Sequence, residues 1–276
     1  MAVSSLLADA VQVEMAGQQP WPDDVVLYQP FADNQILLPD YARCLSVKTF
    51  LRMCSLNFTT EYRSNAEHMS PSGIVPFVQV GPFSVSEFDP IVTFVNTKGH
   101  NLSSDLNDVQ RAEMKAYIAL IENVLGNAEQ FLSWAEASNA NDVSKPRYGS
   151  VFPWPLNMIL PWRKQLAEKQ RLKALGWLEK SYEQVCNEVK TCCSALAEKL
   201  GEQDFFFGNN PTELDAVMFG HIFTLLTAEL PSPRMAEIIS QFVTLNAFCQ
   251  RVEERYFAAN PGVLSDLLPM KQSHFA

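Results

Sequence analysis

The chain has 276 residues, of which 47% are hydrophobic and 19% are charged, and its formal net charge is −10. This composition is typical of a folded globular protein, and the length suffices for one large or two ordinary domains. An acidic balance without a basic tail argues against a nucleic-acid partner. Because no run of about 18 apolar residues occurs, the sequence predicts no membrane-spanning helix.

The beginning of the chain carries none of the common import signals. No Lys or Arg precedes Arg43, whereas a secretory signal begins with basic residues and a matrix-targeting peptide is rich in arginine. Residues 1–20 are therefore expected to form an N-terminal extension, in which 4–16 form a short docked or frayed helix.

The six cysteines, at positions 44, 54, 186, 192, 193 and 249, form no Cys-x-x-Cys motif and match no zinc-ligand spacing. Four of them fall at apolar positions of predicted helices, where a free cysteine packs like a small hydrophobic residue. Reduced core thiols are expected, as in a protein that faces the cytosol. A redox pair of Cys192 and Cys193 is the less favoured alternative, because adjacent side chains on a helix point about 100° apart.

Residues 21–99 alternate between short apolar strands and helices. The order is β-α-β followed by β-β-α, and the proline after Val75 predicts a tight turn with a cis bond. The predicted elements are a buried strand at Val25–Tyr28, a helix capped by Asp40 and running through Cys54, a strand at Asn57–Arg63, two strands that follow Val75-Pro76 and are joined by Gly81-Pro82, and a helix at Pro90–Thr97 that Gly99 ends.

From Leu106 onward the pattern contains only helices. Thr212 and Asp215 predict a reciprocal capping box at the start of one of them, which is a structural role. Strands followed by a run of helices predict an α/β part beside an all-α part. Four apolar stripes at helical spacing carry the prediction: Val109, Ala112, Ala116, Leu120, Val124, Ala128, Phe131 and Trp134; Tyr182, Val185, Val189, Cys192, Leu196 and Leu200; Ala216, Phe219, Phe223, Leu226 and Leu230; Leu245, Phe248, Val252 and Tyr256.

The order of these elements resembles the glutathione transferase superfamily. The resemblance implies a thioredoxin-like α/β domain at 21–99, an all-α C-terminal domain at 106–260 and a tail at 261–276. In that superfamily, a hydroxyl or cysteine near the end of the first strand activates the thiol of glutathione. A cis-proline loop presents main chain to the bound peptide, and an acid or amide followed by serine binds its γ-glutamyl end.

The thiol-activating group of such a site is missing from the expected place. Tyr28 is the candidate donor, but a packing role under the following loop is the favoured interpretation. Between Tyr28 and Asp40 the chain has no Ser, Thr or Cys, and Cys44 lies too far into the helix. The sequence therefore predicts no catalytic residue and a protein that is not an enzyme.

The rest of the pocket is predicted to be vestigial. Val75 and Pro76 keep the loop and Glu87 matches the acid, but Phe88 stands where the serine is needed. A lost hydrogen bond of this kind costs about 1–3 kcal/mol, or one to two decades of affinity. No cofactor is expected. No metal is expected either, because the histidines His68, His100, His221 and His274 lack metal-ligand spacing, and His221 has the position of a core histidine.

Residues 146–162 combine four prolines with two tryptophans and follow no period. The favoured interpretation is a rigid loop folded onto its own domain. The functional alternative is a recognition surface, since rigid aromatic anchors suit interfaces. The candidate partner-binding residues are Trp154, Pro155, Trp162, Arg163 and Lys164. The cations from Arg163 to Lys173 form a solvated face by default, or contact anionic headgroups or an acidic partner.

Several strings together resemble the metaxin family over most of the chain, from about Trp21 to Phe257. They are Leu-Tyr-Gln (27–29), Gln-Ile-Leu-Leu (35–38), Asn-Ala-Glu-His-Met-Ser-Pro-Ser-Gly-Ile-Val-Pro-Phe (65–77), Lys-Ala-Tyr (115–117), Arg-Tyr-Gly-Ser (147–150), Pro-Trp-Pro-Leu-Asn (153–157) and Pro-Thr-Glu-Leu-Asp-Ala (211–216). The resemblance implies a non-enzymatic, peripheral subunit on the cytosolic face of the mitochondrial outer membrane. A metaxin 1-type partner would hold it there, so that membrane contact is indirect.

The same resemblance implies work in the sorting and assembly machinery for β-barrel outer-membrane proteins, in mitochondrial protein import, and as an adaptor to motors. The competing hypothesis is an active cytosolic glutathione transferase, which needs a donor at Tyr28 together with the Glu87 clamp. A third possibility lies between the two: the pocket edge at Val75 holds an extended peptide by main-chain bonds without catalysis.

Overall fold

The structure is a computed structural model that describes residues 20–257. The helix predicted at 4–16 and the tail predicted at 261–276 lie outside the described residues. The N-terminal part contains β1 (Val26–Gln29), α2 (Leu38–Met53), β2 (Thr59–Tyr62), α3 (Ala66–Met69), β3 (Phe77–Val80), β4 (Phe83–Ser86) and α4 (Phe88–Thr97).

The four strands form one mixed sheet in the order β2-β1-β3-β4. β1 pairs parallel to β2 and antiparallel to β3, and β3 pairs antiparallel to β4. Leu27 and Val78, opposite each other on β1 and β3, pack into one core with α2 and with Ile91 of α4. This is the predicted thioredoxin-like arrangement, with the short helix α3 as an element that the sequence pattern did not reveal.

The cap predicted for the first long helix is wrong. The helix begins at Leu38, two residues before Asp40, and its N-cap Leu37 makes no side-chain hydrogen bond. Pro39 lies in the first turn, where its fixed φ suits a helix and its missing N–H costs nothing, so the helix starts ahead of Asp40. The Asp40 carboxylate accepts from Arg43 within the helix instead, at 2.9 Å.

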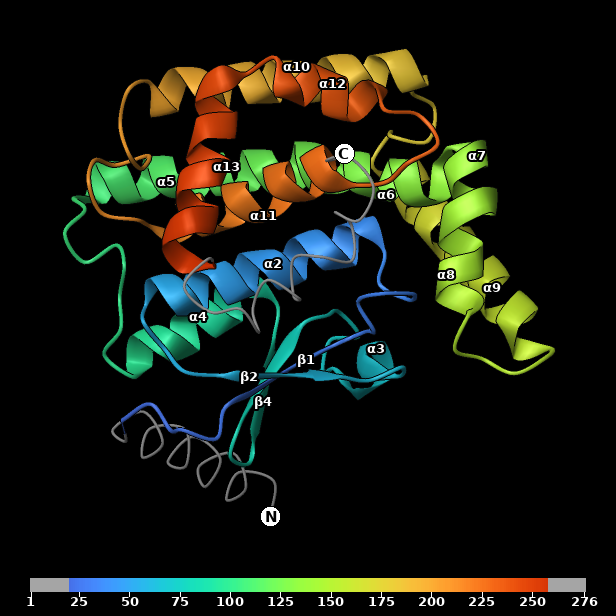
Figure 1. Ribbon diagram of the computed structural model, residues 1–276, viewed down its shortest axis with the longest axis horizontal. Coiled ribbons are helices and arrows are strands. Elements are labelled where there is room, and N and C mark those ends of the chain that lie inside the picture. Colours follow the sequence, from blue (N-terminus) through green and yellow to red (C-terminus); the bar gives the residue numbers. More distant parts are fainter. Residues whose placement is uncertain (1–19, 258–276) are drawn as a thin grey trace.

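The C-terminal part is all helical. Most of its helices lie above α2 on the side away from the sheet, and the others lie beside one end of α2 (Figure 1). The helices are α5 (Asp108–Ile121), α6 (Asn127–Gln130), α7 (Ala137–Asn139), α8 (Lys145–Gly149), α9 (Leu156–Ala174), α10 (Tyr182–Leu200), α11 (Glu213–Thr227), α12 (Arg234–Ser240) and α13 (Val243–Tyr256). Three π-helical turns, η1 (Glu122–Gly126), η2 (Phe131–Ala135) and η3 (Ala140–Ser144), join α5 to α8.

The first predicted apolar stripe is wrong in its N-terminal half. Val109, Ala112 and Ala116 are exposed, whereas Met114, Ile118, Ile121 and Leu125 are buried. Both sets have helical spacing on α5 and its continuation, and only the packing against α11 decides which faces inward. Beyond η1 the predicted stripe is buried again at Ala128, Phe131 and Trp134, because each π turn adds a residue and rotates the side chains that follow.

Helix α11 lies at the centre of the molecule, and the side chains from Glu213 to Leu225 are all buried. At its start the Asp215 carboxylate accepts the amide of Thr212 at 2.7 Å, the Thr212 hydroxyl at 2.8 Å and the amide of Phe206 at 3.0 Å. The bond from the Thr212 amide belongs to the predicted capping box, which satisfies helix-end groups with no intrahelical partner, and the bond from Phe206 ties the preceding loop to the same carboxylate. Burial nevertheless raises the pKa of Asp215 to about 6.

The two parts of the chain meet where α11 crosses α2, and Gly220 makes this crossing possible. A Cβ atom at Gly220 would lie 2.0 Å from the Ser46 Oγ and 2.6 Å from the carbonyl oxygen of Ala42. The absence of a side chain therefore allows the two helices to touch through their backbones.

Cys192 and Cys193 are buried free thiols on α10, and burial raises the pKa of Cys192 to about 12.

Candidate functional site

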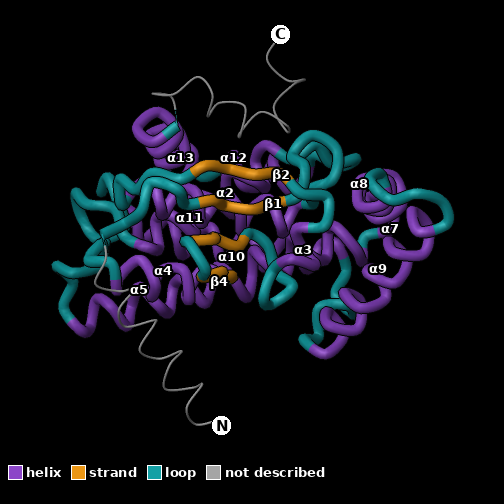
Figure 2. The backbone as a smooth tube through the Cα atoms, turned by 90° about the horizontal axis from the view of Figure 1, so that it is seen from below, coloured by secondary structure: helices purple, strands orange, loops and turns teal. Residues whose placement is uncertain are grey.

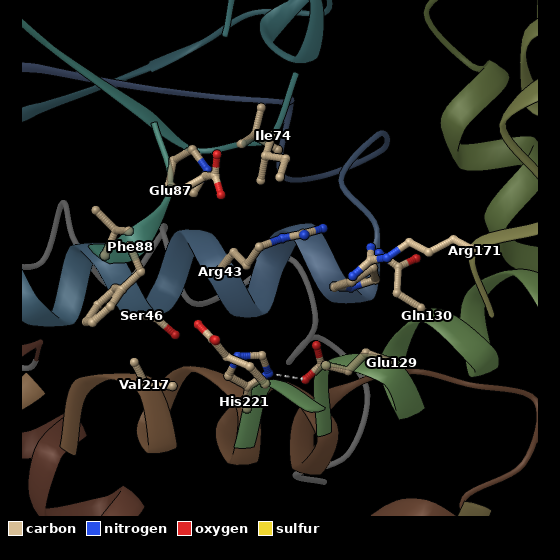
Figure 3. Close-up of a pocket in the computed structure, with 16 residues that line it drawn as sticks. Arg43, Ser46, Ile74, Glu87, Phe88, Glu129, Gln130, Arg171, Val217 and His221 are labelled. Carbon is tan, nitrogen blue, oxygen red and sulfur yellow. Dashed lines mark hydrogen bonds and ion pairs between the residues drawn. The ribbon is translucent and has the colours of Figure 1, made fainter. Parts of the chain in front are cut away.

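A cavity of about 230 Å³ lies between the two parts of the chain (Figure 3). One wall is α2, with Arg43 and Ser46, and the opposite wall is the Val75-Pro76 loop with the start of α4. The floor comes from the helical part and includes Glu129 and Gln130 in α6 and His221 in α11. Glu122 in η1 also lines the cavity. This position corresponds to the pocket that the transferase resemblance implies.

Four of the five predicted pocket residues come together at this cavity: Val75, Pro76, Glu87 and Phe88 all line it. The Val75-Pro76 bond is cis. Glu87 has φ 70, an unfavourable region for a residue with a side chain, and it is the N-cap of α4 without capping through its side chain. These four residues therefore meet at one cavity, and its descent from a ligand pocket stays a prediction.

The Phe88 side chain has an apolar packing role. Its ring packs edge-on against Phe50 of α2, with the ring centroids 5.6 Å apart. A phenyl ring at this position offers no hydrogen bond to the γ-glutamyl end of a peptide. At the position where the transferase resemblance implies a serine, Phe88 therefore packs against α2.

Tyr28 does not line the cavity. Side chains alternate along β1, so that Leu27 enters the core against α2 and Tyr28 points to the other face of the sheet. There its ring stacks on Phe77 at 4.8 Å, with an angle of 12° between the planes, and the guanidinium of Arg63 lies 6.0 Å from its centroid. Tyr28 therefore has a packing environment on the side of the sheet away from the cavity.

The buried polar pair in the floor of the cavity is a feature that the sequence analysis did not assign. Nδ1 of His221 lies 2.8 Å from the Glu129 carboxylate, and both side chains are almost completely buried. Burial raises the pKa of Glu129, and His221 and Arg43 act in the opposite direction. No local signal could reveal the pair, because its members are 92 positions apart. His221 is nonetheless the buried core histidine that its apolar helix indicated.

The loop between β1 and α2, where a thiol-activating group would lie, is held by the helical part of the chain. Arg147 of α8 donates to the carbonyl oxygens of Ala32 at 3.1 Å and Ile36 at 3.2 Å. The hydroxyl of Ser150 lies between two acceptors, the Arg147 carbonyl oxygen at 2.8 Å and the Asn34 carbonyl oxygen of the loop at 3.2 Å. These contacts give the Arg-Tyr-Gly-Ser string a structural purpose: it fastens the loop.

The same string binds α3. The Tyr148 hydroxyl donates to Glu67 at 3.0 Å, and Lys164 of α9 donates to the same carboxylate at 2.6 Å. Burial and the Glu67 charge raise the pKa of Tyr148. At Gly149 an added Cβ would lie 2.5 Å from the Asn157 carbonyl oxygen, so α8 and α9 also approach each other closely.

The predicted partner-binding residues separate into two groups. Trp154, Pro155, Trp162 and Arg163 lie on the surface, and Trp154 is 79% exposed. Lys164 lies apart from them, because it pairs with Glu67 and also with Glu168 at 3.2 Å. Its charge is paired within the molecule, and the assignment of these five residues to a partner-binding surface stays a prediction.

The fold and the cavity define a protein of the glutathione transferase-like class. A glutathione S-transferase from Methylobacterium radiotolerans superimposes with a TM-score of 0.55 at 15% identity and covers 92% of this chain and 98% of its own. A β-etherase from Sphingobium has a TM-score of 0.55 at 16% identity, with 88% and 98% covered. A family model described as the glutathione S-transferase C-terminal domain matches residues 189–252. At such identities the likeness concerns the fold alone.

Sequence comparison is more specific. Metaxin-2 of Homo sapiens is 47% identical over 92% of this chain and 96% of its own length, and the metaxin-2 homolog of Caenorhabditis elegans is 39% identical over 82% and 96%. Metaxin-1 of Mus musculus is 31% identical over 77% and 69%. A family model described as outer mitochondrial membrane transport complex protein matches residues 44–165. The chain belongs to the metaxin family.

Proposed function

We propose that this protein is a non-catalytic subunit in protein transport at the mitochondrial outer membrane. Its membership of the metaxin family is the observation that carries the proposal. The family model for outer mitochondrial membrane transport complex proteins supports the same role, because it matches across both parts of the chain. The glutathione transferase-like fold then serves as a scaffold.

Three features of the site support the absence of transferase activity. Tyr28 lies on the far face of the sheet, stacked on Phe77. Among the described residues that line the cavity, Ser46 carries the only hydroxyl group, and it donates to the Ala42 carbonyl oxygen of its own helix at 2.9 Å. Phe88 occupies the position of a hydrogen-bonding serine. A bound thiol would therefore find no free hydroxyl group among these lining residues to stabilise its thiolate.

The protein acts as a peripheral subunit on the cytosolic face, together with a metaxin 1-type partner, in the sorting and assembly of β-barrel proteins. Within residues 20–257, none of the helices has the length and apolar character needed to cross a bilayer. The 31% identity to mouse metaxin-1 supports a partner of the same fold. A link to motor proteins has no support from the described part of the chain.

Affinity purification of the full chain from mitochondria tests the transport role. A metaxin 1-type protein and outer-membrane assembly subunits should co-purify. Their absence, with the bait intact and on the membrane, would refute the role.

Catalysis is tested with the purified chain and chlorodinitrobenzene. We expect neither retention on immobilised glutathione nor conjugation above background. Micromolar glutathione binding that Tyr28→Phe abolishes would instead support the active transferase.

A further inference from the structure

Helices α7, α8 and α9 form a lobe that projects from one end of the molecule (Figures 1 and 2). The start of α9 and the loop before it carry six of the eleven large apolar side chains that are exposed among the described residues. We call this set the lobe tip; its members are Trp154, Leu156, Met158, Ile159, Trp162 and Leu166. Exposed apolar side chains gathered in this way mark an interaction surface.

The lobe tip is not needed for the packing of α9. The buried side of this helix is formed by Pro161, Glu168 and Leu172. Met158, Trp162 and Leu166 follow one another at four-residue intervals, which places them in one line on a different side of the helix. Trp162 is 60% exposed and Met158 68% exposed, so the protein core gains little from either.

The same line continues with positive charge. Lys169 and Lys173 lie three and seven residues after Leu166, so they extend the apolar line toward the end of α9. Helix α9 has five basic residues and one acidic residue, in a chain with 21 basic and 31 acidic residues. Neither lysine, nor Arg163, forms an ion pair with another residue in the described range 20–257. Uncompensated positive charge thus lies next to the apolar tip.

We propose that the lobe tip inserts into the headgroup region of an anionic lipid bilayer. Tryptophan is favoured at the boundary between headgroups and acyl chains, because its ring is apolar and its N–H is polar. Lysines that follow on the same line reach anionic headgroups when the helix enters at an angle with its apolar start deepest. The chain as a whole has a net charge of −10, whereas α9 has an excess of basic residues, so an anionic surface attracts this helix.

This contact goes beyond the proposed function, in which a partner holds the protein and membrane contact is indirect. From the sequence, a protein partner was the functional alternative for Trp154 and Trp162, and anionic headgroups were one of the alternatives for the cations from Arg163 to Lys173. A change from apolar to basic along one line of a projecting helix fits a layered bilayer boundary better than a uniform protein interface. The proposal needs no partner, so it is tested with the purified full chain.

The test is co-sedimentation with vesicles of phosphatidylcholine, with and without phosphatidylglycerol. We expect salt-sensitive binding to the anionic vesicles. Trp154→Ser combined with Trp162→Ser should abolish it. Lys169→Gln combined with Lys173→Gln should weaken it about thirtyfold, at about fivefold for each basic residue near an anionic surface. Val109→Ser combined with Val243→Ser is the matched control, because these side chains are 77% and 75% exposed elsewhere and should not matter.

Tryptophan fluorescence locates the contact. Trp154 and Trp162 should be quenched by brominated lipid, whereas Trp134 and Trp177 are buried and should be unaffected. A variant with phenylalanine at both exposed positions should keep most of its binding and lose the quenching. All variants should melt at the wild-type temperature, since the changed side chains are exposed, apart from the part-buried Lys169, which has no ion pair in the described range.

Two results would overturn the proposal. One is absence of binding to anionic vesicles, and the other is binding that the double tryptophan-to-serine variant retains. If that variant instead loses a co-purifying outer-membrane protein while vesicles bind neither form, the lobe tip is a protein interface. In that case the transport role stands and the lipid contact falls, so the two failures are distinguishable.

Discussion

Substitution of Gly220 by alanine should destabilise the packing of α11 against α2, where the two parts of the chain meet. The new Cβ would lie 2.0 Å from the Ser46 Oγ, 2.6 Å from the Ala42 carbonyl oxygen and 2.7 Å from the Ser46 amide nitrogen. The hydroxyl can rotate, but the two backbone atoms belong to α2 and cannot move without the helix. Overpacking of this kind costs about 1–3 kcal/mol and sometimes more, while alanine returns about 1 kcal/mol of helix propensity. Because two of the three close contacts are with backbone atoms, the cost lies at the upper end of this range, and we expect a net loss of about 2 kcal/mol.

The assay is the midpoint of chemical denaturation, with Gly126→Ala as the control. An added Cβ at Gly126 meets only Cε1 of His221, at 3.8 Å, which is ordinary contact, so this variant should be at least as stable as wild type. Adding Ser46→Ala to the Gly220 variant removes the shortest contact and leaves the backbone contacts, so it should restore only part of the loss. If Gly220→Ala unfolds at the wild-type midpoint, the contact between α2 and α11 does not depend on the missing side chain.

Three further changes probe the lobe and the core. Arg147→Met removes two hydrogen bonds to loop carbonyls, so it should lower the free energy of unfolding by about 1–3 kcal/mol. It should also speed limited proteolysis between β1 and α2, and an unchanged rate of cleavage there would contradict the role of Arg147 in holding the loop. Glu67→Gln should cost about 1–2 kcal/mol in urea denaturation, since both of its partners are part-buried, and a neutral result would mean that α3 is held otherwise. Burial raises the pKa of Asp215 in the folded state from 3.8 to about 6. The contribution of this group to the free energy of unfolding is therefore largest below its unfolded pKa of 3.8, and it is lost as the pH rises through about 6. The unfolding free energy of wild type relative to Asp215→Asn should therefore fall between pH 4 and 7 by up to about 3 kcal/mol; a rise would show that its three hydrogen bonds outweigh burial.

Prediction from sequence succeeded where the signal is local. Val75-Pro76, the Gly81-Pro82 turn and the strand alternation indicated the second half of a thioredoxin-like sheet, and the structure has it. The Asp40 cap failed because Pro39, one residue earlier, lies in the first turn. The α5 stripe failed because two stripes on one helix have the same period, and the choice between them depends on α11.

Local pattern also could not reveal what lies around the cavity. Because side chains alternate along a strand, Tyr28 and Leu27 must point to opposite faces of the sheet. Only the position of α2 decides which of these faces lies toward the cavity. Similarly, Lys164 has the appearance of a surface cation until α3 brings Glu67 to 2.6 Å. The contacts of Arg147 could not be predicted either, because its partners are main-chain carbonyl oxygens, which every residue has.

The sequence by itself determined the class of the fold, the family and the loss of the serine at Phe88, because each depends on residue identity and near spacing. The tertiary structure alone decided that Glu129 meets His221, that Arg147 fastens the β1–α2 loop, and that Trp154 and Trp162 face solvent. These contacts join residues about a hundred positions apart or depend on which face of a helix is covered. Periodicity specifies that a helix has an apolar side, and only packing specifies which side remains exposed.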